Sequence, residues 1–465
     1  MANSTTHRLE SLKGIVGPEY IKTDPETLST YAVDSVMPWA VVFPGDPGQL
    51  SEVVRLACEE KLALVPWGSG SKMAMGALPS CLDLVICTRR LNRILDMDKA
   101  NLTLTVQAGV RFKEIQSSLV LQEKRNDRER KGCFIPISPP CRHSATLGGI
   151  IAANSSGPTR LLYGLPRDIV LGVHYVGPNG EIIRMGGKTV KNVSGYDMCK
   201  LMIGSHGSLG ILCEMTLRLL PLPESAGTFL SVFAGLSEAS RFVDRVFETS
   251  LLPAAVEILN SMAFELMAPD VAAGLRTGRF AVAAALEGFQ EAVDRMESEI
   301  REMALESGAE KDSYLQDHQH HDFWNHYSNL VPGLSECYPD LVSLKLNYPI
   351  STYIEVIELA DSLISDTQLD YALLAHAGSG IAQIHFLVDQ GDTKATDRIA
   401  LVAERLLDRC KRIGGNLVIE RAKPELKQRL PVWGLPREDM ILIRRIKKEM
   451  DPLGLFCPGR FIRGI

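Results

Sequence analysis

The sequence lacks several features that would place it in a specialised class of protein. Its ten cysteines include no Cys-x-x-Cys pair, which argues against zinc ribbons, ferredoxin-type clusters and a disulfide framework. Its net charge of −6 at pH 7 lacks the basic excess that binds nucleic acids or anionic membranes. No apolar run approaches the roughly 18 residues of a membrane helix, and residues 1–17 lack the apolar core of a secretory signal. We therefore expect a cytoplasmic protein with reduced thiols, no membrane span and no nucleic-acid partner.

Glycine is the residue whose distribution stands out among those present. The chain has 465 residues, of which 45% are hydrophobic and 23% are charged, an ordinary globular composition that suits about two to four domains. Its 38 glycines are unevenly spread, because 14 of them lie between Gly132 and Gly210. Glycine tolerates backbone shapes and close approaches that other residues do not. This segment is therefore expected to turn tightly or to lie against a ligand.

The N-terminal half alternates predicted helices and strands. A helix is expected to begin after Asp46, because apolar residues recur at helical spacing from Leu50 to Ala57. A buried strand follows and ends abruptly in the sequence PWGSGS at 66–71. Further along, the turn-rich sequence PLPES indicates a domain edge. We therefore place a first domain at residues 1–225.

The C-terminal half follows a different pattern. Two successive units of strands and amphipathic helices are predicted, which indicates an antiparallel sheet with helices on one face. We place this α+β cap at residues 226–415 and expect residues 416–465 to return to the first domain as a tail. The segment 311–339 between the two units is polar and is expected to be irregular.

Two groups of charged or titratable side chains are more simply explained by exposure to solvent than by a binding site. The run DHQHHDFWNH at 317–326 holds four of the ten histidines. A metal site there would need particular backbone shapes, so a solvated loop is the favoured interpretation. Near the C-terminus, basic residues are most simply a solvated helix face, with a docking surface for a partner subunit as the alternative. These basic residues are Arg444, Arg445, Lys447 and Lys448.

Three glycine-rich segments could hold one long ligand. The loop PWGSGS at 66–71 follows a strand and exposes backbone N–H groups that can bind an anion, although a plain turn is the alternative. The second segment is SATLGGIIAANSSG at 144–157, and the third is KNVSGYDMCKLMIGSHGSLGIL at 191–212. Each segment is weak evidence alone, but their order and spacing together suggest loops that converge on one cofactor.

These segments make the chain resemble the FAD-binding PCMH-type flavoproteins. This family shares the fold of vanillyl-alcohol oxidase, D-lactate dehydrogenase and the flavin subunits of glycolate oxidase, and the resemblance runs from about Tyr31 to the C-terminus. It implies an α+β fold, with an FAD-binding domain of two subdomains and a ferredoxin-like α+β cap. It also implies FAD as the cofactor, bound non-covalently as far as the loop at 66–71 is concerned, because no histidine lies there.

The resemblance transfers FAD-binding roles to residues of all three segments. They are Pro66, Trp67, Gly68, Ser69, Gly70 and Ser71 in the first, Gly148, Gly149, Ala152, Asn154 and Gly157 in the second, and Gly195, Gly207, Leu209, Gly210 and Ile211 in the third.

The cap departs from the pattern of relatives that oxidise 2-hydroxy acids. Those relatives carry HxGDGNxH, which supplies two histidine metal ligands, and EHG, which supplies a glutamate ligand and a histidine base. Here HAGSGIAQIHF begins at His376, and Gln383 occupies the second ligand position while His385 arrives two residues later. Glu420 matches the glutamate, but Arg421 occupies the position of the base and cannot accept a proton near neutral pH. We therefore predict no metal and take His376, His385 and Arg421 as the candidate catalytic residues.

The tail resembles the smaller, E-type flavin subunit of glycolate oxidase. The similarity spans residues 420–461 and includes VWG at 432–434 and the final DPLG…PGRF, although Cys457 replaces the usual asparagine. That subunit works beside a larger flavin subunit and an iron–sulfur subunit, which implies similar partners here.

The sequence therefore predicts an FAD-dependent oxidoreductase that oxidises a small 2-hydroxy acid such as glycolate or lactate. In this prediction the enzyme acts as one subunit of a larger complex and passes electrons to a partner. The alternative is a catalytically quiet FAD-binding subunit that relays electrons or supports a catalytic partner, because two of the four expected positions in the cap are changed.

Overall fold

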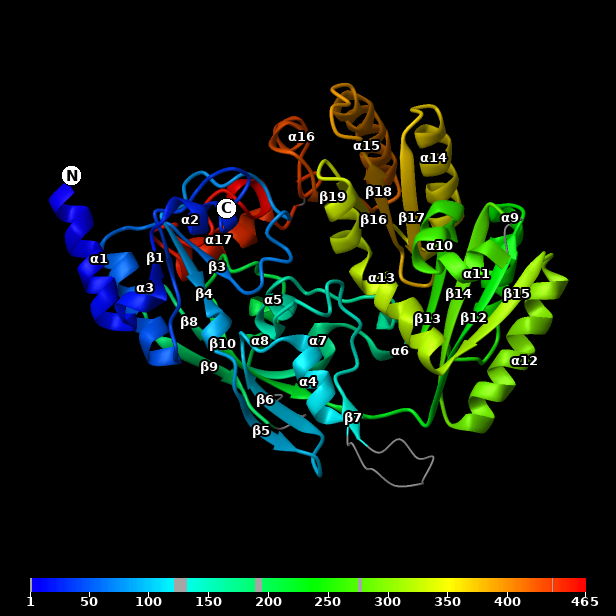
Figure 1. The fold of residues 1–465 in the computed structure, drawn as a ribbon, viewed down its shortest axis with the longest axis horizontal. Coiled ribbons are helices and arrows are strands. Elements are labelled where there is room, and N and C mark those ends of the chain that lie inside the picture. The colour runs from blue at the N-terminus through cyan, green and yellow to red at the C-terminus, as the bar shows by residue number, and fades with distance from the viewer. Residues whose placement is uncertain (1, 121–131, 189–194, 275–277, 437) are drawn as a thin grey trace.

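The chain folds into two lobes, shown side by side in Figure 1. The structure, a computed structural model, describes residues 2–120, 132–188, 195–274, 278–436 and 438–465. The N-terminal lobe holds a four-stranded and a five-stranded sheet with helices around them, and the second lobe holds one large antiparallel sheet. This arrangement confirms the predicted α+β class, with an FAD-domain-like lobe of two subdomains and a ferredoxin-like cap.

The first subdomain is a four-stranded sheet flanked by helices. Its order is β1-β2-β4-β3, and β4 runs parallel to both β2 and β3. The helix predicted after Asp46 is confirmed as α3, and the Asp46 carboxylate caps it by accepting from the Gln49 N–H at 3.0 Å. The elements are α1 (Ala2–Val16), β1 (Ile21–Lys22), α2 (Pro25–Thr30), β2 (Ala40–Val42), α3 (Pro47–Glu59), β3 (Leu64–Trp67) and β4 (Leu84–Cys87).

The second subdomain is a five-stranded sheet of order β5-β6-β10-β8-β9, antiparallel throughout. Its strands are β5 (Ile94–Asp98), β6 (Thr103–Gln107), β8 (Val170–Val176), β9 (Ile182–Gly186) and β10 (Ile211–Arg218). Its helices are α4 (Phe112–Leu119), α5 (Leu147–Ala152), α6 (Arg160–Tyr163), α7 (Pro166–Ile169) and α8 (Cys199–Met202). A short pair, β7 (Cys133–Phe134) with β11 (Leu220–Pro221), lies beside it.

The cap is an eight-stranded sheet made of two similar halves. Each half reads strand–helix–strand–strand–helix–strand, and the halves join where β13 pairs with β17, giving the order β15-β12-β14-β13-β17-β18-β16-β19. The first half is β12 (Ser225–Phe233), α9 (Leu236–Glu248), β13 (Ala255–Asn260), β14 (Phe280–Gly288), α12 (Gln290–Glu306) and β15 (Lys311–Gln316). The second is β16 (Val342–Asn347), α14 (Tyr353–Ser365), β17 (Asp370–His376), β18 (Ile381–Leu387), α15 (Ala395–Arg412) and β19 (Asn416–Arg421).

The prediction of helices on only one face of this sheet is wrong. The four helices of the two halves pack on one face, but α10 (Ser261–Met267), α11 (Pro269–Gly274) and α13 (Asp317–Cys337) pack on the other. The segment expected to be irregular therefore holds β15 and the 21-residue helix α13. The apolar residues Phe323, Tyr327, Leu330 and Leu334 bind α13 to the sheet, because they recur every three or four residues.

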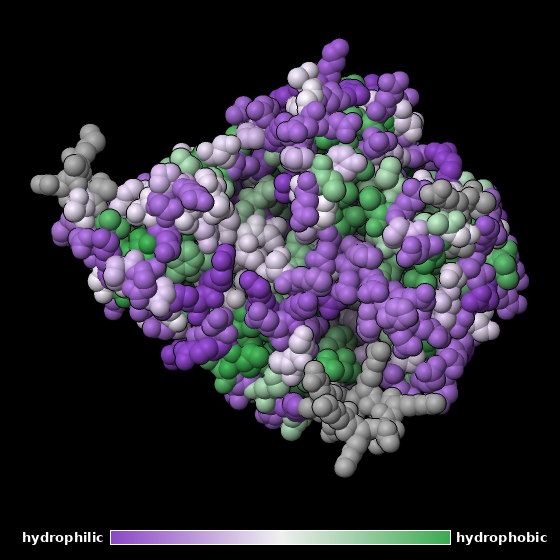
Figure 2. All heavy atoms as spheres, in the orientation of Figure 1, coloured by the Kyte–Doolittle hydropathy of each residue, from purple (hydrophilic) through white to green (hydrophobic). Residues whose placement is uncertain are grey.

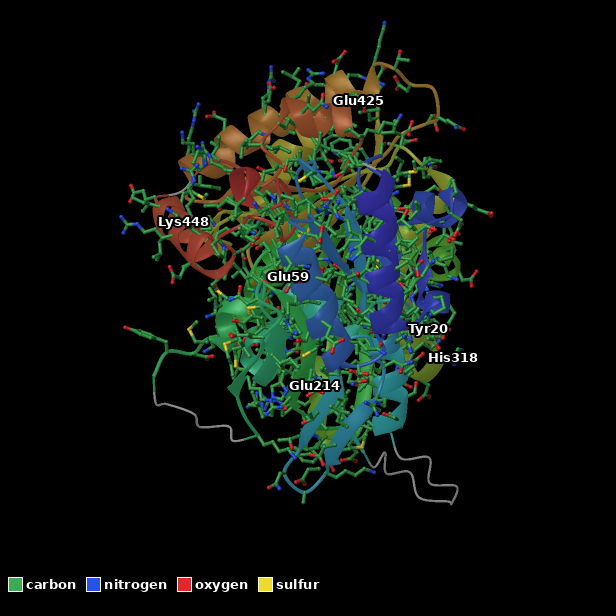
Figure 3. The ribbon with its side chains drawn as sticks, turned by 90° about the vertical axis from the view of Figure 1, so that its left-hand side faces the viewer. Tyr20, Glu59, Glu214, His318, Glu425 and Lys448 are labelled. Carbon is green, nitrogen blue, oxygen red and sulfur yellow. The ribbon has the colours of Figure 1, made fainter. Side chains whose placement is uncertain are left out.

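The interpretation of the histidine-rich run as a solvated loop is also wrong. It forms the first turns of α13, where His320 is buried beside the Thr228 hydroxyl, at 2.8 Å from its Nδ1. His326 Nδ1 bonds the Met267 carbonyl at 3.0 Å. Only part of the run faces solvent, as His318 does at the edge of the molecule in Figure 3.

The C-terminal segment contacts both lobes. β19 forms an edge of the cap sheet, and the chain then continues through α16 (Pro424–Arg429) and α17 (Met440–Met450). Past α17, the Leu64 N–H donates to the Leu455 carbonyl and the Cys457 N–H donates to the Leu64 carbonyl, both at 2.8 Å. The red end of the chain in Figure 1 therefore lies in the N-terminal lobe. The domain boundaries at 225 and 415 stay predictions.

The basic residues of α17 do not share one environment. Lys448 points away from the protein in Figure 3 and is exposed. Lys447 is buried, where its ammonium bonds Asp451 at 2.6 Å and the Ser208 carbonyl at 2.7 Å. The solvated-face interpretation is therefore wrong for Lys447. Hydrophilic residues cover most of the face drawn in Figure 2, and no helix in the described part of the chain is long and apolar enough to cross a bilayer.

Candidate active site

The three glycine-rich segments meet at one place, between the two small sheets. Gly68 follows β3 and packs so closely on the start of α5 that a Cβ there would lie 2.2 Å from Oγ1 of Thr146. Gly207 has a φ of +73°, and a Cβ there would lie 2.9 Å from the Pro66 ring. Much of the glycine crowding thus has a cause inside the protein, because these loops pack against one another.

A cavity that is partly open to solvent lies between these loops. The predicted cofactor residues that line it are Pro66, Trp67, Gly68, Ser69, Gly70, Ser71, Gly148, Gly149, Ala152, Gly207, Gly210 and Ile211. We call it the flavin cavity.

Four predicted cofactor residues do not line the flavin cavity. Leu209 is buried in the core of the second subdomain, and Gly157 lines a neighbouring cavity. Gly195 has open space around it, and residues 191–194 of its motif lie outside the described residues. Asn154 has a φ of +45°, and its buried Oδ1 has no hydrogen-bond partner.

The C-terminal tail supplies flavin-cavity residues that the motifs did not identify. Trp433, Cys457, Arg460 and Phe461 line the cavity together with His206. The Trp433 indole N–H donates to the Arg460 carbonyl at 2.9 Å. Burial lowers the pKa of His206 to about 4, so its ring is neutral near pH 7. The sequence signals for these residues were the resemblance of the tail at 432–434 and 457–461 and, for His206, its place in the third glycine-rich segment.

The residues of the flavin cavity fit FAD. The loop at 66–71 and the start of α5 present small residues and backbone groups, the surroundings that a pyrophosphate needs. Trp67, His206 and Trp433 add aromatic surface for rings.

A second cavity, which we call the reaction cavity, lies between the flavin cavity and the cap. Ser71, Lys72 and Met75 line both cavities and therefore connect them. The three candidate catalytic residues, His376, His385 and Arg421, all line the reaction cavity, as do Gln383 and Glu420. Helix α13, which the sequence analysis had expected to be irregular, forms another wall through Tyr327, Ser328, Leu330 and Val331.

Strand register explains why these cap residues face one cavity. His385 lies opposite Ser343, which also lies opposite Arg421, so the three share one face of the sheet. The register shifts between Ser343 and Leu344, and this bulge leaves Glu420 without a cross-strand partner. A bulge can turn neighbouring side chains toward the same side, which accounts for Glu420 and Arg421 both lining the cavity.

Positive charge surrounds the Glu420 carboxylate. Lys72 Nζ lies 3.5 Å from Glu420 Oε2 and joins the first lobe to the cap. Burial acts to raise the pKa of Glu420, but the cations Lys72 and Lys345 hold it below its ordinary value. Burial also lowers the pKa of the Lys345 ammonium. The glutamate is therefore an anion held by lysines.

The two candidate histidines have different partners. His385 Nδ1 lies 2.9 Å from the Ser343 hydroxyl, and burial lowers the pKa of His385 to about 4. His376 Nδ1 instead lies 2.7 Å from Glu257 Oε1. His376 therefore has a carboxylate that can stabilise a positive ring, whereas His385 has a neutral partner. The sequence analysis did not identify Glu257.

The arrangement contains no evident metal cage. Within the described ranges, no group of three or more histidine, cysteine, aspartate or glutamate side chains is placed to hold a metal ion. The groups present can bind an anion and accept a proton.

Comparison with known families accounts for this architecture. Residues 38–186 match the family model of the FAD binding domain. Residues 222–461, more than half of the chain, match the model of the C-terminal domain of FAD linked oxidases.

Characterised relatives align along nearly the whole chain. Glycolate oxidase subunit GlcD of Bacillus subtilis is 27% identical over 97% of this chain and 96% of its own length. D-2-hydroxyglutarate dehydrogenase of Xanthomonas citri pv. viticola is 28% identical over 98% of this chain and 97% of its own. D-lactate dehydrogenase of Anaerostipes hadrus is 26% identical over 89% of this chain and 87% of its own.

Solved structures show the same fold. The 4-ethylphenol oxidase of Gulosibacter chungangensis superposes with a TM-score of 0.75 at 16% identity, covering 100% of this chain and 98% of its own. p-Cresol methylhydroxylase superposes with a TM-score of 0.75 at 17% identity, covering 99% and 97%. The matched domains, the relatives and the flavin cavity agree. The chain belongs to the FAD-linked oxidase family and is an FAD-dependent oxidoreductase.

Proposed function

We propose that this protein oxidises a small 2-hydroxy acid to the 2-oxo acid, with FAD bound non-covalently. The observation that carries the proposal is the reaction cavity, which adjoins the flavin cavity and brings two histidines and an arginine together. The names of the relatives, which include a glycolate oxidase subunit and D-lactate and D-2-hydroxyglutarate dehydrogenases, support the same substrate class.

Arg421 suits the carboxylate of such a substrate. It lines the reaction cavity and has no ion-pair partner among the residues that the structure describes. Burial lowers the pKa of its guanidinium, yet arginine stays charged at any physiological pH. A guanidinium binds a carboxylate through two parallel hydrogen bonds, which would fix the acid group and direct its C2 carbon.

His376 suits the hydroxyl of the substrate. Its ring lines the reaction cavity, and its other side meets Glu257. The ring would take the hydroxyl proton while the C2–H bond breaks, and the Glu257 carboxylate would stabilise the positive charge. FAD supplies the two-electron acceptor for this chemistry when it is bound. His385 is the weaker candidate, because its lowered pKa makes it a poorer proton acceptor.

Non-covalent FAD binding is supported by the cavity's own side chains. Cys457 lines the flavin cavity, but burial raises the pKa of its thiol to about 11, so little thiolate is present for attachment. FAD should therefore appear in the supernatant after acid precipitation of the protein.

The alternative is a quiet subunit that relays electrons beside a catalytic partner. Gln383 and Arg421, at the two changed positions, favour it. The name of the GlcD relatives, a subunit of glycolate oxidase, supports partner subunits under either proposal. A second flavin subunit and an iron–sulfur subunit are the partners we propose.

Anaerobic mixing of the FAD-loaded protein with glycolate, lactate and 2-hydroxyglutarate separates these proposals. Bleaching of the visible absorption band of oxidised flavin by a 2-hydroxy acid, with no partner added, is expected for the enzyme. Full reduction by dithionite without bleaching by any acid would favour the relay subunit. Bleaching only by alcohols or amines would contradict the substrate class.

A further inference from the structure

Glu257 and His376 form a buried pair at the junction of the two halves of the cap sheet. They lie directly opposite each other where β13 pairs with β17. Residues opposite each other in an antiparallel pair share one face, so their side chains meet. His376 is 6% exposed and Glu257 is fully buried. Glu257 does not line the reaction cavity, whereas His376 does.

Both carboxylate oxygens of Glu257 are used. Oε1 lies 2.7 Å from His376 Nδ1, and Oε2 accepts the Tyr327 hydroxyl at 2.6 Å. The Tyr327 oxygen also lies 3.4 Å from His376 Nδ1. A carboxylate in this position is fixed from two sides, because Tyr327 comes from α13 and His376 from β17.

This contact determines which ring nitrogen of His376 carries the proton. A carboxylate only accepts hydrogen bonds, so Nδ1 must be the donor. In the neutral ring the lone pair then lies on Nε2. Nε2 has no hydrogen-bond partner within the described part of the protein, and the ring lines the reaction cavity.

We propose that Glu257 is a positioning residue that holds His376 with Nδ1 protonated and Nε2 free to accept the substrate's hydroxyl proton. The inference rests on the proposed function. Three other titratable or charged groups lie around the pair: Tyr327 on α13, Arg160 on α6 and Tyr348 after β16. Four more line the reaction cavity: Lys72, His385, Glu420 and Arg421. Glu257 is the anion that contacts the ring.

The test compares Glu257→Gln with a matched variant, Glu287→Gln. Glu287 is a partly buried glutamate on the neighbouring strand β14, and it accepts a tyrosine hydroxyl, that of Tyr163, at 2.5 Å. It lies outside the reaction cavity. Both changes preserve side-chain volume and remove one carboxylate that accepts a tyrosine hydroxyl, so the loss of that hydrogen bond is matched.

The limiting rate of anaerobic flavin reduction by the best 2-hydroxy acid is expected to fall about 100-fold in Glu257→Gln, because a misoriented base loses most of its catalytic effect. The half-saturating acid concentration should change less than about threefold, since Glu257 does not touch the substrate. Glu257→Asp should recover part of the rate. Glu287→Gln should stay near the wild-type rate, with FAD content and unfolding midpoint recorded for every variant.

Two results would overturn the proposal. One is an unchanged limiting rate in Glu257→Gln with normal FAD content. The other is a wild-type rate that a chelator abolishes and Zn²⁺ restores, which would make His376 a metal ligand. A failure of the proposed function can be told apart from a failure of this proposal by a measurement that needs no substrate. The Nδ1–H of His376 should give a proton NMR resonance downfield of the amides. That resonance is expected in the wild type and absent in His376→Gln and in Glu257→Gln whichever substrate is used.

Discussion

At the scale of single residues, buried histidines make the protein sensitive to acid. Burial lowers the pKa of both His206 and His385 to about 4, below the unfolded value of 6.5. The unfolded chain therefore binds protons first as the pH falls. The contribution of these neutral rings to the free energy of unfolding is fully present above about pH 6.5 and is lost progressively toward pH 4.

Replacing His385 should make the free energy of unfolding less dependent on pH. Between pH 7 and pH 5 each buried histidine is expected to remove about 2 kcal/mol of the free energy of unfolding. His385→Gln should lower that loss by about the same amount, while exposed His318→Gln should leave it unchanged. Urea unfolding at the two pH values measures the difference. Equal pH dependence in the wild type and His385→Gln would show that His385 is accessible to protons in the folded state.

The residues that line the reaction cavity or position its side chains were only partly predictable. His376, His385 and Arg421 could be named because short motifs mark them. Glu257 could not, because it stands alone among apolar residues of a strand and its partner His376 lies 119 positions away. Lys72 lies one residue past the recognised loop. Such residues become visible only when the strand register and the domain arrangement are known.

At the scale of elements, regular apolar periodicity predicted most strands and helices, and α13 was the main failure. Its first turns are rich in histidine, aspartate and glutamine, and Pro332 lies inside it, so composition indicates a loop. The apolar stripe begins only at Phe323. The energy that makes this segment helical comes from packing on the cap sheet, a contact that local sequence does not reveal.

Truncating the apolar stripe of α13 tests this explanation. Phe323 is 1% exposed, so Phe323→Ala should lower the free energy of unfolding by about 3–5 kcal/mol. His318→Ala, at an exposed position of the same helix, should stay within about 0.5 kcal/mol. Urea titration of both variants provides the comparison. Similar small effects of the two changes would indicate that the segment does not pack as a helix.

At the scale of the whole molecule, the tail ties the cap to the flavin cavity through buried charges. Lys427 of α16 bonds Asp34 at 2.6 Å and the Ala74 carbonyl at 2.7 Å. Arg460 donates to the carbonyls of Met73 and Met75. The loop that they hold includes Met73 and Met75, which line the flavin cavity. Stability of the tail and retention of FAD should therefore be coupled.

Lys427→Met is expected to lower both the stability of the fold and the retention of FAD. Burial lowers the pKa of Lys427, and its side chain is fully buried against Asp34, so removing it leaves a poorly compensated carboxylate. Loss of one partner of a buried pair costs about 3–5 kcal/mol. Arg429→Met is the matched control, because Arg429 pairs with Asp397 on the exposed side of the same helix, where such pairs contribute about 0–1 kcal/mol. FAD content after gel filtration and the thermal midpoint measure the two effects. If Lys427→Met destabilises the protein yet retains FAD as the wild type does, the tail stabilises the fold without shaping the flavin cavity.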